Sequence, residues 1–194
     1  MLNSTAVAAP QTALISRLGE LTWLKQLLIV LGGATFTAIC AQIRIPLEPV
    51  PITLQTLGVM LTGLALGGRL GLTSQVAYIS GGLGGLPIFA EGKSGLAIMA
   101  GPTGGYLVGF VVAAFILGEL SARGWDRSRP KLIAACVLST LSILGLGFVW
   151  LTRFVPNLHV AWAVGVAPFL LGDVIKTAVV VMLVPPAAKA VARL

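Results

Sequence analysis

Charged residues are scarce in this sequence. Its 194 residues include 13 Lys or Arg and 6 Asp or Glu, so charge accounts for only 10% of the chain. A soluble domain carries about 25% charged residues. Hydrophobic residues make up 57% of the chain, and too few polar groups remain to cover a surface in water. The composition therefore excludes an ordinary soluble domain and predicts an integral membrane protein.

The residues that build metal and catalytic centres are few as well. The chain has one histidine, His159, and two cysteines, Cys40 and Cys136, both of which fall inside predicted membrane helices. No GxSxG or HExxH sequence occurs, and the first glycine that a Walker phosphate loop ending at Lys93 would need is missing. We therefore predict no enzyme activity, no metal site and no cofactor.

Long apolar runs are what the chain does have. About 20 apolar residues let a helix cross a bilayer, and the sequence contains six such segments with no internal repeat. The last begins near Pro168, and Pro185 and Pro186 are expected to stop it; a short apolar piece before it, VAWAVGV, reads as an interfacial helix. We predict one domain over residues 1–194, an all-α integral membrane protein with six transmembrane helices at 24–42, 53–67, 70–84, 104–121, 132–151 and 168–184.

Lys and Arg are distributed unevenly between the connections. The net charge is +7, but no aromatic stacking platform accompanies the basic residues, so we predict orientation in a membrane and no nucleic-acid binding. With both termini in the cytosol, and residues 1–22 as a cytosolic lead-in that does not resemble a signal peptide, nine cations lie inside and three outside. The inner cations are Arg17, Lys25, Arg69, Arg123, Arg127, Arg129, Lys131, Lys189 and Arg193, and the outer cations are Arg44, Lys93 and Arg153.

Two of the outer connections have unusual compositions. The segment 44–52, RIPLEPVPI, packs three prolines into nine residues, which favours a stiff extended loop. The segment 81–106 is rich in glycine and holds two prolines. Irregular backbone at membrane depth persists where protein buries it or where it lines a cavity. Simple turns remain possible, but we predict that both loops shape a ligand cavity open to the outside.

An acid and a base lie inside the last apolar run. Asp173 and Lys176 are three residues apart, so they share one face of the predicted helix. A charge in the middle of a bilayer costs about 2.5–3.5 kcal/mol on insertion scales. The presence of two charged residues in this helix therefore needs an explanation. Either the two residues neutralise each other and tie the helix to its neighbours, or they form a polar ligand site inside the bundle.

Other residues are candidates for contacts with a ligand or a partner. A tyrosine offers a ring and a hydroxyl to a ligand, although each one alone also fits a membrane interface, and a loop lysine can simply be solvated. Ala34 and Ala38 are four apart and leave room for another helix, which is either a neighbour in the bundle or a partner protein. The candidates for ligand contacts are Thr53, Gln55, Tyr78, Lys93, Ser94 and Tyr106.

Four stretches of the chain resemble one known family. They are PVPITLQTLGVMLTGLALGGRLG (49–71), YISGGLGGLPIF (78–89), GPTGGYLVGF (101–110) and PFLLGDVIK (168–176). In order and spacing they resemble BioY, the biotin-binding substrate component (S component) of energy-coupling factor transporters. The resemblance covers residues 24–185. It implies six membrane helices with cytosolic termini, an outward-facing cavity that binds biotin with high affinity, and the cytoplasmic membrane of a bacterium.

The resemblance also implies roles for particular residues and partners. Binding falls on Asp173, Lys176 and Tyr106, with Gln55 as a further pocket residue and the 44–52 loop as the gate over the ligand. Lys93 occupies a position that varies in the family. Ala34 and Ala38 match a motif that contacts a transmembrane coupling protein, on which the S component is thought to topple and which two ATPases drive.

Several alternatives stay open from the sequence alone. Either end of biotin could lie deepest, and the chain could share a coupling module, have its own, or associate with itself in the lipid bilayer. The rival functions are an S component for another vitamin, a self-sufficient proton-coupled carrier with Asp173 as the relay, and, more remotely, a membrane enzyme.

Overall fold

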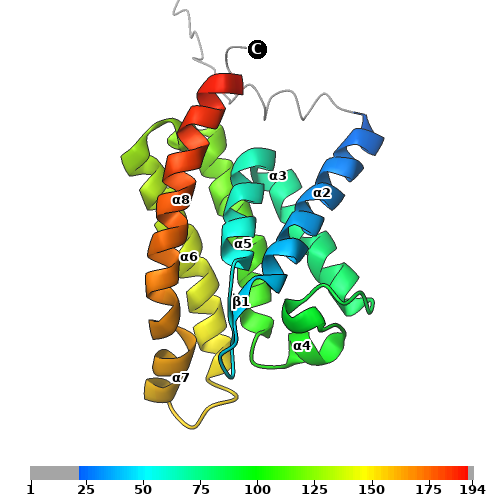
Figure 1. The fold of residues 1–194 in the computed structure, drawn as a ribbon, viewed down its shortest axis with the longest axis vertical. Helices are drawn as coiled ribbons and strands as arrows, with labels where there is room; N and C mark the ends of the chain where they lie inside the picture. The colour runs from blue at the N-terminus through cyan, green and yellow to red at the C-terminus, as the bar shows by residue number, and fades with distance from the viewer. Residues whose placement is uncertain (1–21, 192–194) are drawn as a thin grey trace, which may run out of the picture.

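The computed structural model describes residues 22–191, which form a bundle of long helices (Figure 1). Residues 1–21, including Arg17, and 192–194, including Arg193, lie outside the described part. The helices are α2 (Trp23–Gln42), α3 (Gln55–Leu83), α4 (Leu96–Ala100), α5 (Gly104–Ala122), α6 (Arg129–Leu151), α7 (Leu158–Gly165) and α8 (Ala167–Val191). Short elements are the strands β1 (Arg44–Ile45) and β2 (Ile52–Thr53) and the 3₁₀ turns η1 (Ala90–Gly92) and η2 (Trp125–Arg127).

The long helices have the length and apolarity of membrane spans. Five stretches qualify in residues 22–191: α2, α3, α5, α6, and the α7–α8 stretch Leu158–Pro185. Their outer faces carry large apolar side chains, such as Leu171 and Met182 of α8, each 72% exposed. A surface of this kind is stable against lipid and not against water. The predicted all-α membrane fold is confirmed.

Helix α3 consists of two antiparallel arms. Gly67 interrupts it with φ 80° and ψ 174°, a conformation that glycine tolerates best. Gln55 Nε2 donates to Tyr78 Oη at 2.7 Å although the two residues are 23 positions apart, and one straight helix would separate them by about 35 Å. The chain therefore turns back at Gly67, and the arms correspond to the segments predicted at 53–67 and 70–84.

Helix α8 ends later than predicted. It continues through Pro185 and Pro186 to Val191, so the prediction that these prolines stop the helix at 184 is wrong. A proline removes one backbone hydrogen bond and displaces the carbonyl four residues earlier, which can bend a helix without ending it. The short apolar piece before α8 is the separate helix α7, as predicted, and its side-chain cap is Asn157, which accepts from the Val160 N–H.

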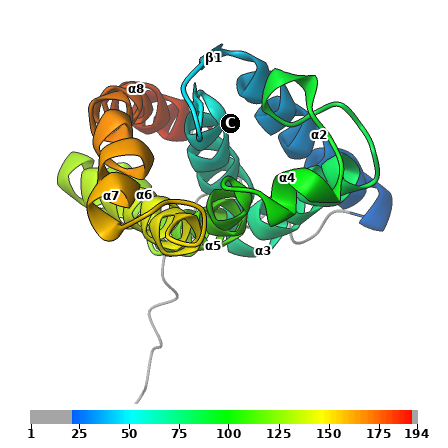
Figure 2. The same cartoon turned by 90° about the horizontal axis from the view of Figure 1, so that it is seen from below.

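The two unusual loops lie at one end of the bundle, together with α7 (Figures 1 and 2). Segment 44–53 is extended and forms a small hairpin in which Arg44 pairs with Thr53 and Ile45 with Ile52. The glycine-rich connection is partly ordered into η1 and α4, which its composition does not reveal. The opposite end holds the Gly67 turn and η2. The described cations separate by end as predicted from the sequence: Arg44, Lys93 and Arg153 lie at the loop end.

The core divides into two apolar clusters. One includes Tyr78, Phe89, Tyr106, Phe110 and Phe169 and lies towards the loop end. The other, at the η2 end, includes Met60, Leu117 and Leu132. Aromatic rings thus concentrate on the side of the bundle where the cavity opens.

Candidate ligand-binding site

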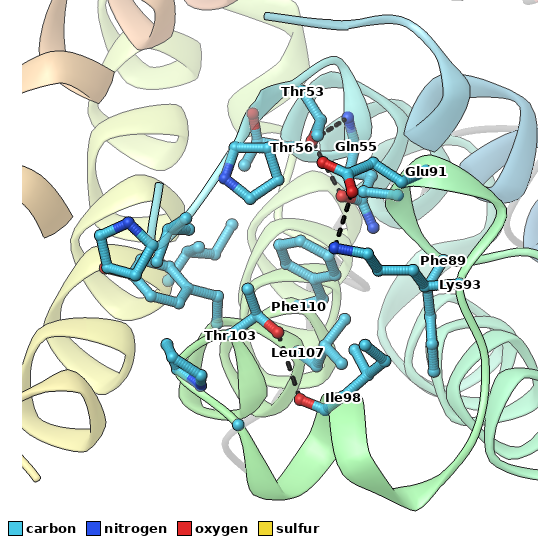
Figure 3. Close-up of a pocket in the computed structure, with 18 of the residues that line it drawn as sticks. Thr53, Gln55, Thr56, Phe89, Glu91, Lys93, Ile98, Thr103, Leu107 and Phe110 are labelled. Atoms are coloured by element: carbon cyan, nitrogen blue, oxygen red, sulfur yellow. Dashed lines mark hydrogen bonds and ion pairs between the residues drawn. The ribbon is translucent and has the colours of Figure 1, made fainter. Parts of the chain in front are cut away.

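A cavity of about 180 Å³ lies at the loop end of the bundle (Figure 3). A cavity that holds one water has a volume of about 10–15 Å³, so this cavity has room for a small organic molecule. Both unusual loops contribute to its wall, the hairpin through Pro49, Val50 and Pro51 and the glycine-rich connection through residues from Phe89 to Thr103. The prediction that these loops shape a cavity is confirmed.

A buried charge pair borders the inner part of this cavity. Lys176 Nζ lies 3.3 Å from Asp173 Oδ1 and donates to Thr56 Oγ1 at 2.6 Å. The Thr56 hydroxyl in turn lies 3.4 Å from the same Asp173 oxygen. Asp173 and Lys176 are each 5% exposed. The three groups form a closed polar cluster between α8 and the first arm of α3, with no net charge.

Within that cluster only some members reach the cavity. Lys176 and Thr56 line it, and Asp173 does not. An ammonium group has three donors, and two of those of Lys176 have partners among residues 22–191, so one remains for a ligand. Asp173 Oδ1 faces Lys176 and Thr56 and so compensates the lysine, and the predicted contact between Asp173 and a ligand stays a prediction.

Gln55 lines the cavity and is held in place by two side chains. Its Oε1 accepts from Thr53 Oγ1 at 2.9 Å, and its Nε2 donates to Tyr78 Oη at 2.7 Å. Tyr78 Oη donates onward to the carbonyl of Ile88 at 3.2 Å. Thr53 lines the cavity beside Gln55, but Tyr78 is fully buried behind it. Tyr78 therefore supports Gln55 and does not line the cavity, and its predicted ligand contact stays a prediction.

Tyr106 contributes its ring to the cavity wall. Its hydroxyl donates to the Gly165 carbonyl at 2.8 Å, which ties α5 to α7. The ring packs against Phe169 with centroids 6.0 Å apart. Tyr106 is thus placed as predicted, but its polar atom is already engaged, and the ring is the part that a ligand would meet.

Most of the remaining wall is apolar. Phe89, Phe110 and Phe169 come from three different segments and surround the cavity together with Leu107, Ile143 and Leu144. Such a wall suits a ligand with an apolar body and few polar groups. Sequence reasoning missed these side chains, although each phenylalanine lies within one of the quoted motifs.

The exposed end of the cavity, called its mouth below, is lined by Glu91 and Lys93. Lys93 Nζ lies 2.6 Å from Glu91 Oε2, and Arg44 Nη1 lies 2.8 Å from Glu91 Oε1. The hydrogen bond from Lys93 is the main cause that holds the pKa of Glu91 below its ordinary value. Lys93 therefore lies where it was predicted. Ser94 is half-buried and does not line the cavity.

The two alanines of α2 lie away from the cavity. Ala34 is buried in the core, and Ala38 is partly buried against the same cluster. At the neighbouring Gly33, an added Cβ would meet Ser74 and Thr62 of α3. This close approach corresponds to the alternative of packing inside the bundle. Ala34 offers almost no surface to a partner, and a partner contact through Ala38 stays a prediction.

Two polar residues of the site also escaped the sequence analysis. Thr56 directly follows Gln55 at the start of α3, and its hydroxyl mediates between Asp173 and Lys176. Glu91 lies two residues before Lys93, and its backbone has a positive φ of 69°. Helical spacing could have placed Thr56 beside the charge pair only if the packing of α3 against α8 were known.

A family model for the BioY family matches residues 10–193 of the chain. Among curated proteins, a probable biotin transporter BioY from Pyrococcus horikoshii is 38% identical over 159 residues, which cover 82% of this chain and 93% of the relative. The biotin transporter BioY from Thermotoga maritima is also 38% identical, over 157 residues that cover 79% of this chain and 92% of the relative.

A solved structure has the same fold. It is the crystal structure at 2.1 Å of the S-component for biotin from an ECF-type ABC transporter. The TM-score is 0.73 at 28% sequence identity, and the match covers 86% of this chain and 92% of the other.

Proposed function

This chain belongs to the BioY family, and on that premise we propose that it binds biotin in the cavity at its loop end and mediates biotin uptake as the S component of an ECF-type ABC transporter. The observation that carries the proposal is the distribution of polar groups around an apolar cavity. Amide and hydroxyl groups and the compensated Lys176 lie at its inner part, and Lys93 lies at its mouth.

Biotin has a chemical group for each of these regions. Its ureido ring offers two N–H donors and one carbonyl, its thioether ring is apolar, and its valerate tail ends in a carboxylate. The aromatic wall formed by Phe89, Phe110 and Phe169 is suited to the fused rings. The amide of Gln55 and the hydroxyls of Thr53 and Thr56 can exchange hydrogen bonds with the ureido group.

The charges favour one orientation of biotin. At the inner part Asp173 neutralises Lys176, so this region is polar without net charge. At the mouth, Lys93 lines the cavity and shares the Glu91 carboxylate with Arg44, so Lys93 is the cation nearest to a ligand there. Because an anion is stabilised where the net charge is positive, we place the ureido ring inside and the carboxylate at the mouth, near Lys93.

Titration of the purified protein with biotin and with biotin amide, whose tail is neutral, tests both the function and the orientation. We expect saturable biotin binding below the micromolar range. Lys93→Gln should weaken the binding of biotin and leave biotin amide unaffected, whereas Lys176→Gln should weaken both. An absence of saturable binding by the wild-type chain refutes the function, and the opposite ligand dependence of the two variants refutes the orientation.

Energy coupling is the second part of the proposal. We propose that the chain lies in the cytoplasmic membrane, has no catalytic activity of its own, and docks on a transmembrane coupling protein with two ATPase subunits. The rival, a proton-coupled carrier, needs a carboxyl group free to exchange protons, and Asp173 already compensates Lys176 at 3.3 Å. Uptake into proteoliposomes that contain the coupling proteins should require ATP. Uptake that follows a pH gradient without ATP would favour the rival.

A further inference from the structure

One acidic residue joins the two loops at the mouth of the cavity. The carboxylate of Glu91, in η1, uses one oxygen for Arg44 of β1 at 2.8 Å and the other for Lys93 at 2.6 Å. In residues 22–191 the Arg44–Glu91 contact is the one ion pair between the hairpin 44–53 and the connection 84–103. The hairpin and the connection both contribute to the cavity wall. Their relative position therefore depends on this carboxylate.

The backbone of Glu91 is in an unfavourable conformation. Its φ is 69° and its ψ is 20°, and it is the one non-glycine residue with positive φ in the part of the chain that the structure describes. Glycine adopts this conformation without cost, and the flanking sequence supplies glycine freely at Gly92 and Gly95. A glutamate at this position costs free energy, which its side-chain contacts must offset.

Apart from Val50, which is buried in the core, and Ile52, which packs against it, the hairpin has little else to hold it. Its strands are two residues long, and only one pair of strands is formed. Its prolines cannot donate backbone hydrogen bonds. Gln42, at the end of α2, donates to the Phe89 carbonyl at 3.1 Å and so anchors the connection, but this contact does not include the hairpin. The Arg44–Glu91 ion pair can therefore decide whether this small hairpin lies over the cavity or away from it.

We propose that Glu91 is a positioning residue that keeps the hairpin closed over the bound ligand through Arg44, and that it thereby slows dissociation of the ligand. The inference rests on the proposed function and adds to it a role for Glu91 and an effect on the rate of ligand dissociation. The Arg44 and Glu91 side chains are 32% and 28% exposed, and a pair at this exposure changes an equilibrium by up to about five-fold. The closed state is therefore favoured, but it can still open to release the ligand.

Stopped-flow dissociation of biotin amide measures the effect without a contribution from the ligand carboxylate. We expect Glu91→Gln and Arg44→Gln each to accelerate dissociation by about two- to five-fold, and the double variant no more than the faster single variant. Arg44→Lys keeps the charge and should retain most of the slow rate. Glu91→Gly relieves the backbone and removes the carboxylate, so it should be as fast as Glu91→Gln. The matched control Glu48→Gln, on the same hairpin but outside the cavity wall, should equal the wild type.

Hydrogen exchange of residues 44–53 in the ligand-free protein gives a second readout. Faster exchange in Glu91→Gln and Arg44→Gln, but not in Glu48→Gln, supports the bridge even without a ligand. Unchanged dissociation and exchange, or single effects that multiply in the double variant, overturn it. A wild-type chain that fails to bind biotin overturns the proposed function instead, and the exchange measurement still decides the role of Glu91.

Discussion

Asp173 and Lys176 are neighbours on one face of α8, yet they differ in what they contribute. Both are 95% buried, but only Lys176 reaches the cavity. Burial of two charges costs several kcal/mol per ion, and their attraction repays this cost only when both partners are present. Asp173 therefore contributes to folding, because it compensates Lys176, and Lys176 contributes both to folding and to the site.

Substitution of the pair should separate these two contributions. We expect Asp173→Asn and Lys176→Met each to lower the free energy of unfolding by about 3–5 kcal/mol, because each leaves an uncompensated buried charge. The double variant should regain much of this stability. Its biotin affinity should stay weaker by about 1.5–3 kcal/mol, the worth of a hydrogen bond from a charged donor. Thermal unfolding in detergent and biotin titration measure the two quantities.

Asp173→Asn is the informative control for this pair. Its folded fraction should bind biotin within a few-fold of the wild type, since Lys176 keeps its place in the cavity wall. If Asp173→Asn loses as much affinity as Lys176→Met, the aspartate contacts the ligand directly. If the double variant binds like the wild type, neither residue contacts it.

Glu91 should make ligand dissociation depend on acid. The hydrogen bond from Lys93, with the nearby charge of Arg44, lowers the pKa of Glu91 in the closed structure. A group whose pKa is lowered in one state stabilises that state above its unperturbed pKa and ceases to do so as the pH falls through the lowered value. Dissociation of biotin amide should stay slow from neutral pH through mildly acidic pH and accelerate only below the ordinary range of glutamate.

The Glu91→Gln variant is the reference for this pH profile. Glutamine does not titrate, so its dissociation should be fast at every pH and the wild-type rate should approach it in acid. Acceleration of the wild type near neutral pH, or an equal acid response in the variant, would mean that another group is responsible.

The sequence could name the polar residues of the site but not assign their roles. Lys176, Gln55, Thr53, Tyr106 and Lys93 line the cavity as predicted. Polarity inside an apolar run identifies a candidate, but the rotamer and the nearest neighbour decide whether it faces a cavity or supports another side chain. Neither Tyr78 nor Asp173 lines the cavity, but each contacts a residue that does, Gln55 and Lys176 respectively.

The turn inside α3 depends on a close contact with α5. A Cβ added at Gly118 would lie 2.1 Å from the backbone N of Gly68 and 2.2 Å from the carbonyl carbon of Gly67. Real side chains essentially never approach backbone this closely, so α5 can reach the turn only with glycine at position 118. This contact places the two arms of α3 against α5.

Gly118→Ala should therefore destabilise the bundle. We expect a loss of at least about 1–3 kcal/mol, the usual cost of overpacking a core, since backbone atoms cannot move aside as a side chain can. Gly145→Ala on α6 is the matched control, because its added Cβ meets nothing within 4 Å. Its stability should stay equal or rise slightly through better helix propensity. Equal melting temperatures of Gly118→Ala and the wild type in detergent would contradict this packing.

The helix boundaries predicted from the sequence agree with the structure at the glycine turn of α3 but not at the end of α8. The glycine pair at 67–68 and Arg69 separated two apolar runs, and the chain does turn there. The prolines at 185 and 186 indicated an end that α8 does not have. A proline removes one backbone hydrogen bond. Whether the helix continues past it depends on how the rest of the helix is packed. The order within the 84–103 connection, η1 and α4, depends on contacts with α2 and α5 that its glycines do not reveal.

The whole molecule has two chemically different ends. Arg69 at the α3 turn and the cluster Arg123, Arg127, Arg129 and Lys131 lie at the η2 end, while the cavity, Arg44, Lys93 and Arg153 lie at the other. Sequence counting predicted this separation before the fold was known. Positive residues are retained on the cytosolic side during insertion, so the end with the cavity should face outward, as uptake of an external ligand requires.

Two exposed residues in the first turns of helices allow this orientation to be measured. His159 lies in α7 at the cavity end, and Lys131 lies in α6 at the opposite end. Both native cysteines are buried, so a cysteine at either position would dominate labelling by a membrane-impermeant maleimide. His159→Cys should be labelled in intact cells, and Lys131→Cys only after the membrane is broken. Because the inner cations outnumber the outer ones nine to three in the sequence, loss of one should not invert the chain. The reverse labelling pattern would put the cavity on the cytosolic side and remove the basis for uptake through it.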